Sequence, residues 1–297
     1  MIKKFKISVS NKKINQIYSK VKKYPWNDIK KLDGWTHGTN HKYLKEFSKY
    51  WTSKFNWKKQ EKKINHFSNY ITKVDNINLH FIKENGSGKN PTPLLILHGW
   101  PGSIVEFLDI IKKLAHPEKY GARKEDAFDV IVPSLPGFGF SSAPKKPLGP
   151  RSIAKILNKF MTKNLGYKKY IAQGGDWGAS ICNWLGYDHS ISCKAIHINC
   201  LTMRHPKGPI NKTEKDWEKR FSNDQIMQDG YRTIQATKPQ TLSYSMNDSP
   251  VGVAAWILEK FYSWSDIKKK NIESVYTKDI LLTNIMIYLV TNTFNTA

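Results

Sequence analysis

The chain has 297 residues, of which 39% are hydrophobic and 12% are aromatic, so it can bury a sizeable core and is not intrinsically disordered. The formal net charge is +24, yet all but five of the 48 basic residues are lysine, whereas nucleic-acid surfaces favour arginine. We interpret this charge as a compositional bias on solvated faces. We therefore expect no nucleic-acid partner.

The cysteine residues and the first ten residues indicate in which cell compartment the protein is expected. Cys182, Cys193 and Cys200 have neither metal-ligand spacing nor the even number of a disulfide framework. We expect no metal, a reducing compartment and a cytoplasmic location. Residues 1–10 lack the apolar stretch of a signal peptide, and no apolar run reaches the ~18 residues of a membrane span. The oligomeric state stays open, with a homodimer as one alternative.

Residues 1–70 are predicted to be helical and rich in aromatic side chains. Apolar residues recur at helical spacing in the segments 14–21 and 43–51. We interpret the aromatic residues of these segments as packing against a neighbouring part of the protein. Three tryptophans lie outside the two helical faces and are candidates to cover a pocket: Trp26, Trp35 and Trp57.

Alternating strands and helices are predicted from residue 70 onward. Residues 70–83 alternate in polarity around Asp75-Asn76, which predicts a β-hairpin. The all-apolar run at 94–97 predicts a strand buried on both faces of a parallel sheet, and further strands of that sheet are predicted at 128–132, 170–172 and 195–198. Amphipathic helices are predicted between these strands. This alternation predicts an α/β fold.

Two further helical regions are predicted from capping and composition. A helix is expected to begin after Ser103, a suitable N-cap with Glu106 three residues later as a capping box. Residues 203–270 are polar, helical and aromatic, which indicates an inserted helical cap. Residues 280–290 are apolar but too short to span a membrane, so we expect a core helix that returns to the main domain.

The stretch Gly174-Gly175-Asp176-Trp177-Gly178 joins an apolar strand to a helical pattern. This is the shape of a nucleophile elbow with aspartate in the place of the more usual serine. Glycines permit the tight turn, and a carboxylate attacks without a base to remove a proton first. The alternative is a glycine-rich turn with an Asx hydrogen bond. We predict that Asp176 is the nucleophile.

An elbow nucleophile needs hydrogen-bond donors for the oxyanion that it generates. The backbone N–H of Trp177 is one donor, and the loop His98-Gly99-Trp100-Pro101 after the earlier strand offers the N–H of Trp100. Preorganised donors of this kind contribute roughly 100- to 1,000-fold each. We therefore predict an oxyanion hole formed by Trp100 and Trp177.

Several long motifs resemble the microsomal-type epoxide hydrolases of the α/β-hydrolase superfamily. They are HGWPGS at 98–103, DVIVPSLPGFGFS at 129–141, QGGDWGAS at 173–180 and the stretch beginning GYRTIQATKPQ at 230–261. Residues 1 to about 100 resemble the N-terminal domain of that family. The resemblance implies an α/β-hydrolase fold, with a helical cap after the sixth strand and an N-terminal helical extension.

The resemblance divides the chain into four parts. Residues 1–93 are expected to form a helical arm with the first β-hairpin, and residues 94–202 the core with the elbow. Residues 203–270 are expected to form the cap. Residues 271–297 are expected to begin the return to the core.

The resemblance also implies a mechanism without a cofactor. Asp176 attacks an epoxide carbon to give an ester, while the cap residue Tyr231 donates a proton to the ring oxygen. Water then hydrolyses the ester to a vicinal diol. The expected substrate is a small apolar epoxide, of the kind removed in detoxification. An alkoxide is a poor leaving group without a nearby acid, which is the chemical reason for a tyrosine here.

This chain departs from the family after the cap. The family's histidine base, its acid and a second cap-side tyrosine all lie beyond the position of Ala297. We therefore expect a C-terminally truncated chain that lacks the last sheet strands and the hydrolytic pair. The other histidines do not fill the role, since His98 belongs to the oxyanion loop, His189 ends a helix, His197 lies in a strand and His205 leads into the cap. An alternative acid is also lacking, because Asn199 and Cys200 follow the strand at 195–198.

Two alternatives remain. A haloalkane dehalogenase uses the same elbow aspartate, with Trp177 holding the halide, although the N-terminal region and Tyr231 favour an epoxide hydrolase. The second alternative is a catalytically dead paralogue that binds apolar ligands or traps them covalently.

Overall fold

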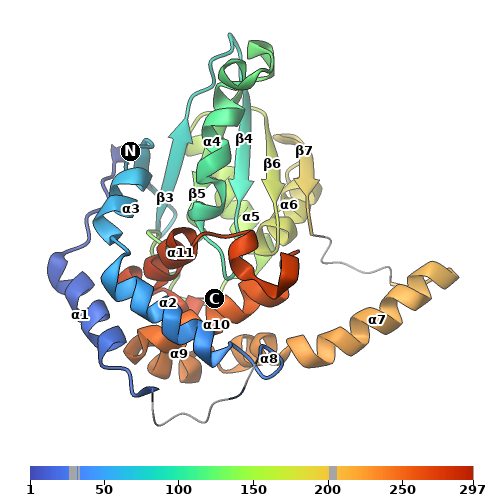
Figure 1. The fold of residues 1–297 in the computed structure, drawn as a ribbon. Coiled ribbons are helices and arrows are strands. Elements are labelled where there is room, and N and C mark those ends of the chain that lie inside the picture. Colours follow the sequence, from blue (N-terminus) through green and yellow to red (C-terminus); the bar gives the residue numbers. More distant parts are fainter. Residues whose placement is uncertain (27–31, 33, 201–205, 297) are drawn as a thin grey trace.

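A mixed sheet forms the centre of the molecule in the computed structural model, which describes residues 1–26, 32, 34–200 and 206–296. Within these residues the sheet has seven strands in the order β1-β2-β3-β5-β4-β6-β7 (Figure 1). The strands β5, β4, β6 and β7 run parallel, whereas β1, β2, β3 and β5 pair antiparallel in that order. The strands are β1 (Ile2–Lys4), β2 (Asn69–Val74), β3 (Ile77–Glu84), β4 (Thr92–Leu97), β5 (Phe128–Pro133), β6 (Tyr170–Gly174) and β7 (Cys193–Ile198).

The predicted hairpin at residues 70–83 is confirmed as β2 and β3, which turn at Asp75 with a φ of 51°. Strand β1 was not predicted, because three residues are too few to show an alternating pattern. The sheet is therefore more antiparallel than expected, and the helical region after β7 follows the seventh strand in chain order rather than the sixth. The four predicted parallel strands are confirmed.

Helices cover both faces of the sheet. Helix α4 (Leu108–Ala115) lies on one face, and α5 (Pro150–Lys159) and α6 (Trp177–Asp188) lie together on the other (Figure 1). The helix predicted after Ser103 begins as a 3₁₀ turn over Ile104–Phe107, and the hydroxyl of Ser103 accepts a hydrogen bond from Val105 N at 3.3 Å. The predicted cap residue is thus confirmed, one turn ahead of the α-helix.

The N-terminal arm consists of α1 (Asn11–Lys22), α2 (His41–Ser53) and α3 (Trp57–Ile64). These helices pack against helices α10 and α11 from the far end of the chain (Figure 1). Phe47 and Trp51 of α2 are fully buried, as expected for a packing face. Trp57 is also buried in the core, where its indole N–H donates to Glu61, so the prediction that it covers a pocket was wrong.

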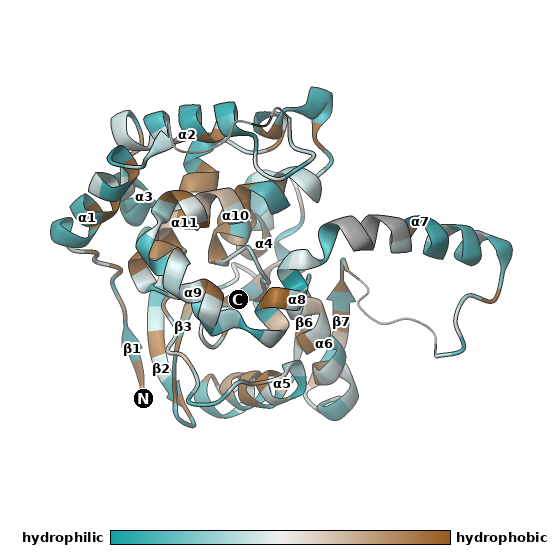
Figure 2. Ribbon diagram, turned by 90° about the horizontal axis from the view of Figure 1, so that it is seen from below, coloured by the Kyte–Doolittle hydropathy of each residue, from teal (hydrophilic) through white to brown (hydrophobic). Residues whose placement is uncertain are grey.

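The second half of the chain is helical after β7. Its helices are α7 (Lys212–Gln228), α8 (Gly230–Thr237), α9 (Pro239–Asp248), α10 (Pro250–Ser263) and α11 (Lys278–Thr291). Helix α7 projects from the body of the molecule (Figure 1). Helix α11 is buried along residues 281–289, which confirms the core helix predicted from its apolar run, and its apolar colour lies at the centre of Figure 2. Among the described helices, none combines the length and apolar character that crossing a membrane requires.

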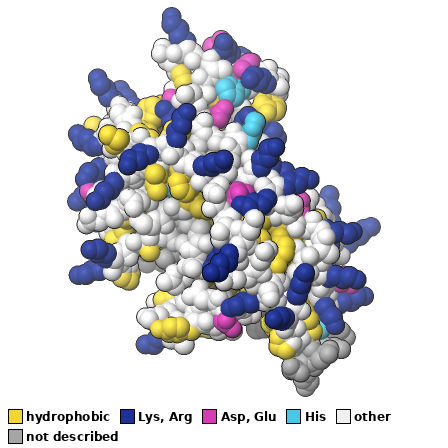
Figure 3. All heavy atoms as spheres, turned by 90° about the vertical axis from the view of Figure 1, so that its left-hand side faces the viewer, with side chains coloured by type: hydrophobic (Ala, Val, Ile, Leu, Met, Phe, Trp, Pro, Cys, Tyr) yellow, Lys and Arg dark blue, Asp and Glu magenta, His cyan; other side chains and the backbone are white. Residues whose placement is uncertain are grey.

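The basic side chains are dispersed. On the face in Figure 3, lysine and arginine side chains are spread among uncharged and apolar ones and do not gather over one element. This distribution agrees, for that face, with a bias of composition on solvated surface.

Candidate active site

Asp176 lies at a strained turn between β6 and α6. Its backbone has φ 51° and ψ −123°, a conformation that costs a non-glycine residue on the order of 1–3 kcal/mol. The turn is tight because glycines flank it: a Cβ on Gly174 would lie 2.3 Å from the carbonyl carbon of Gly178, and a Cβ on Gly178 would lie 2.2 Å from the carbonyl oxygen of Leu97. This is the geometry of a nucleophile elbow.

Two backbone N–H groups bind the Asp176 carboxylate. Trp100 N donates to Asp176 Oδ1 at 2.8 Å, and Trp177 N also donates to this carboxylate. Gly99 permits the close approach, because a Cβ there would lie 2.1 Å from Asp176 Oδ1. The two predicted oxyanion donors therefore converge on the predicted nucleophile.

Desolvation by the surrounding protein has the largest effect on the pKa of Asp176, the predicted nucleophile, although the residue remains exposed to solvent. Desolvation raises the pKa of Asp176 above its ordinary value, and the N–H donors of Trp100 and Trp177 act in the opposite direction. Desolvation, followed by the charge of Asp176, raises the pKa of Glu106 to about 8, with a partly offsetting hydrogen bond from Ser103 N–H. The pKa values of both neighbouring carboxyl groups are therefore raised, although both residues remain exposed to solvent.

His98 supports the oxyanion loop from its buried position. Its Nε2 accepts a hydrogen bond from Leu135 N at 3.1 Å, and its Nδ1 donates to the carbonyl oxygen of Gly99 at 3.2 Å. Burial lowers the pKa of His98 to about 4, so the ring is neutral at physiological pH. These contacts agree with the expectation that His98 belongs to the oxyanion loop and does not act as the base.

Helix α11 holds the same loop from the other side. Asn284 Nδ2 donates to the carbonyl oxygen of Pro101 at 2.7 Å, and Tyr288 Oη donates to that of Gly102 at 2.7 Å. The hydroxyl of Ser103 in turn donates to Asn284 Oδ1 at 2.7 Å. All three side chains are buried. Successive carbonyl groups of the oxyanion loop are thus fixed by one core helix.

Tyr231 of α8 approaches the loop through its aromatic ring. The ring stacks on Trp100 with centroids 4.9 Å apart and an interplanar angle of 11°, and Trp264 contacts both rings. Burial, followed by the charges of Asp176 and Asp229, raises the pKa of Tyr231 to about 12. The phenol therefore keeps its proton and is able to donate it.

Tyr231 also lines a cavity of about 1180 Å³ between residues 34–40 of the N-terminal arm and helices α8 and α10. Trp35 lines the same cavity and stacks on Tyr262 at 4.0 Å, which confirms its predicted place at a pocket. Trp26 instead packs edge-on against Tyr24 and His41.

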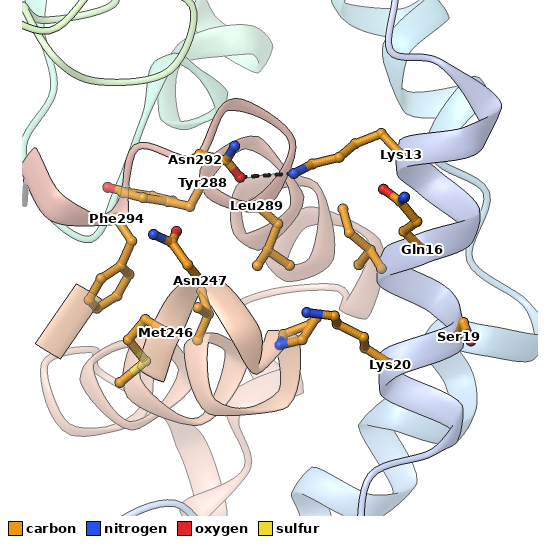
Figure 4. A pocket seen from close by; sticks show the side chains of 13 residues that line it. Lys13, Gln16, Ser19, Lys20, Met246, Asn247, Tyr288, Leu289, Asn292 and Phe294 are labelled. Atoms are coloured by element: carbon orange, nitrogen blue, oxygen red, sulfur yellow. Dashed lines mark hydrogen bonds between the residues drawn. The ribbon is translucent and has the colours of Figure 1, made fainter. Parts of the chain in front are cut away.

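A second cavity of about 430 Å³ lies between α1 and helices α9 to α11 (Figure 4). Lys13 and Lys20 line it, but Lys13 donates to Asn292 Oδ1 at 2.8 Å and Lys20 forms an ion pair with Asp248. Asp176 lines neither cavity, but the larger one is lined by Tyr231, whose ring stacks on Trp100, whereas this one is not. We therefore assign the chemistry to the site around Asp176.

The remaining histidines that were considered lie elsewhere. His189 ends α6, His197 is an exposed residue of β7, and His205 lies outside the described residues. Across the described part of the chain, no imidazole forms a hydrogen bond with Asp176. Nor do its His, Cys, Asp and Glu side chains form a group of three or more suited to a metal ion.

Sequence reasoning missed three residues of this site: Asn284, Tyr288 and the buried Lys260. Asn284 and Tyr288 occur within the apolar run of a core helix, where only the three-dimensional contact reveals their purpose. A polar residue inside such a run is the signal that could have indicated them. Glu106 was predicted as a capping partner, and the structure shows in addition that its pKa is raised in part by the charge of Asp176.

Comparisons with known proteins agree with this geometry. Residues 2–107 match the family described as epoxide hydrolase N terminus, and residues 92–244 match the alpha/beta hydrolase fold. A putative epoxide hydrolase of Stigmatella aurantiaca (strain DW4/3-1) is 36% identical, over 97% of this chain and 66% of that protein. Epoxide hydrolase 1 of Oryctolagus cuniculus is also 36% identical, over 98% of this chain and 70% of that protein.

Solved structures are similar along the whole chain. The juvenile hormone epoxide hydrolase of the silkworm Bombyx mori superposes with a TM-score of 0.89 and 30% identity, covering 100% of this chain and 75% of that one. The Aspergillus niger epoxide hydrolase superposes with a TM-score of 0.85 and 27% identity, covering 100% and 77%. The fold is that of the α/β hydrolases. Within that superfamily, the chain belongs to the epoxide hydrolases and spans roughly two thirds of the length of the curated relatives named above.

Proposed function

We propose that this chain opens epoxides by attack of the Asp176 carboxylate on a ring carbon. The observation that carries the proposal is one arrangement. The carboxylate stands at a strained elbow and is held by Trp100 N–H, while the ring of Trp100 stacks on the acid Tyr231. Trp100 therefore contacts both the nucleophile, through its backbone N–H, and the proton donor, through its ring.

The step balances as a simple displacement. An oxygen lone pair of Asp176 forms a bond to the epoxide carbon, and the bond from that carbon to the ring oxygen breaks. The electron pair passes to the ring oxygen, which takes the phenolic proton of Tyr231. The products are a β-hydroxyalkyl ester on Asp176 and a tyrosinate, which regains its proton from water.

The acid favours an epoxide over a halide as substrate. A halide leaves without a proton, so a dehalogenase gains nothing from a phenol with a raised pKa beside its nucleophile. An epoxide oxygen leaves as a strongly basic alkoxide and does need this proton. The position of Tyr231 against Trp100 is therefore the reason to set the dehalogenase alternative aside.

Hydrolysis of the ester is a separate step. Water must attack the ester carbonyl with help from a base, and the N–H groups of Trp100 and Trp177 are placed to stabilise the oxyanion. The ring of His98, in the loop that binds Asp176, is engaged through both nitrogen atoms and so does not serve as this base, and we propose that this chain stops at the ester.

Intact-mass measurement tests this proposal. The chain incubated with styrene oxide should gain the mass of one epoxide molecule, and peptide mapping should place the adduct on Asp176. Asp176→Asn should abolish the adduct, whereas Asp266→Asn, at an exposed carboxylate, should form it at the normal rate. An unmodified chain would refute the nucleophile. Steady diol production would refute the arrest at the ester.

The acid has its own test. Tyr231→Phe keeps the stacking on Trp100 but removes the proton, and it should slow adduct formation by roughly 100-fold or more. Tyr244→Phe is a matched control, because the hydroxyl of Tyr244 lies on the exposed surface of α9. An unchanged rate in Tyr231→Phe would assign the acid to another group.

A further inference from the structure

Lys260 of α10 is a lysine that the structure buries, with 6% of its surface exposed. Its Nζ lies 4.7 Å from the ring centroid of Tyr231 and 5.4 Å from that of Trp264. Its charge is partnered by Glu259 Oε2 at 2.5 Å. Burying an ammonium group is costly unless it is paired, so this placement calls for an explanation.

The mechanism described above does not use this lysine. Tyr231 contacts Trp100, Trp264 and Lys260, and the backbone of Trp100 binds Asp176. A continuous set of contacts therefore runs from the nucleophile to the acid and on to the ammonium group. The titratable groups whose charges shift the pKa of the Tyr231 hydroxyl are Asp176, Asp229 and Cys200, which disfavour its phenolate, and Arg232, which favours it.

Resting on the proposed function, we propose that Lys260 is a positioning residue for the tyrosine acid, which it holds against Trp100 and whose phenolate it stabilises as the proton leaves. A cation attracts the face of an aromatic ring through the electron density of that ring. Loss of the proton makes the ring of Tyr231 richer in electrons, so the attraction grows along the reaction. An interaction that strengthens toward the transition state accelerates the chemical step.

The contact also predicts a size for the effect. From the usual strength of cation–π contacts, Lys260→Met should slow adduct formation with styrene oxide by roughly 2- to 30-fold. Lys260→Arg keeps a cation over the ring and should restore most of the rate. Both variants are compared with the unmodified chain by intact mass over time.

The choice of epoxide separates acid support from a structural role. The trichloromethyl group of 3,3,3-trichloropropylene oxide makes its alkoxide a better leaving group, which needs less help from an acid. Lys260→Met should therefore slow adduct formation with styrene oxide more than adduct formation with the trichloro compound. Equal slowing of both epoxides, or no slowing of either, would overturn the proposal.

Glu259→Gln provides a second test with the opposite sign, and it decides the matter if Lys260→Met fails to fold. Removing the carboxylate leaves the ammonium group of Lys260 less neutralised, so its pull on the phenolate should grow and the adduct should form faster. A slower reaction in this variant would overturn the proposal. Absence of any adduct in the unmodified chain would instead refute the function proposed for Asp176, so the two failures are distinguishable.

Discussion

The two halves of the active site are built by different means. Backbone geometry and hydrogen bonds fix the Asp176 half, with a strained elbow, flanking glycines and a loop tied to α11. Aromatic and cationic contacts hold the Tyr231 half, on a helix that has no buried residue of its own. Substitutions that disturb the Asp176 half should therefore cause large losses of stability or of adduct formation. Substitutions in the Tyr231 half should change the rate of adduct formation gradually.

The largest effect is expected at the elbow itself. A Cβ on Gly178 would meet the backbone oxygen of Leu97, which cannot move without disturbing β4. Gly178→Ala should therefore reduce the free energy of unfolding by about 3–4 kcal/mol. Urea unfolding of this variant should be compared with Gly186→Ala in the same helix, whose Cβ would meet only flexible side-chain atoms at 3.4 Å. Equal stability of the two variants would contradict a rigid elbow.

The next largest effect is expected where α11 holds the oxyanion loop. Asn284→Leu leaves the carbonyl of Pro101 and the hydroxyl of Ser103 without their buried partner, which should cost about 2–3 kcal/mol of stability. Displacement of Trp100 N–H should slow adduct formation on Asp176 by roughly 10- to 100-fold. Mass spectrometry measures the second effect. An unchanged adduct rate in a folded Asn284→Leu chain would show that the loop holds itself.

A pH-dependent effect is expected at Glu106. Its pKa is raised from 4.5 to about 8, so its contribution to stability is fully present below about pH 4.5 and is lost as the pH rises through 8. Glu106→Gln cannot ionise, so between pH 5 and pH 8.5 it should lose less stability than the unmodified chain. Because Glu106 is exposed to solvent, screening should limit this difference to roughly 1–2 kcal/mol. The control is Glu46→Gln on the exposed face of α2, and parallel pH profiles for all three chains would exclude a raised pKa at Glu106.

The smallest effect is expected in the cap. Trp264→Phe keeps an aromatic ring near Tyr231 and Trp100 but changes its contact area, and aromatic pairs contribute only about 0.5–1.5 kcal/mol. Adduct formation should slow by less than about 10-fold. The midpoint of urea unfolding should stay within experimental error, since Trp264 is 44% exposed. If Trp264→Phe slowed adduct formation as much as Asn284→Leu does, the contacts of the cap would be as important for the site as those of the oxyanion loop.

The sequence predicted the parts of the site that local patterns encode. Asp176, Trp100 and Trp177 stand in short segments where a strand meets a glycine-rich turn, and those segments are constrained by backbone geometry alone. Tyr231 followed only from a resemblance between long motifs. Asn284 could have been singled out as a polar residue within an apolar run, but its partner and that of Lys260 could not be predicted, because both are set by contacts with residues far away in the chain.

The fold shows the same division. The all-apolar run at 94–97 marked β4, since burial on both faces leaves a clear signal in composition, whereas β7 is mostly exposed. The short strand β1 left no such signal, because its residues are exposed and its pairing with β2 depends on a segment almost 70 residues later. The interaction of the N-terminal arm with α10 and α11 was likewise invisible in the arm's own periodicity, which indicates a packing face but not what covers it.

Hydrogen bonds attach the oxyanion loop to α11, which lies about 180 residues later in the chain. The amide proton of Trp100 can exchange with solvent only when it leaves Asp176, and the loop cannot move far while Asn284 and Tyr288 hold its carbonyl groups. Local opening of the active site is therefore tied to unfolding of a core helix, so that both belong to one cooperative unit. The geometry around Asp176 therefore depends on the assembled core, and not only on the turn Gly174 to Gly178 that carries this residue.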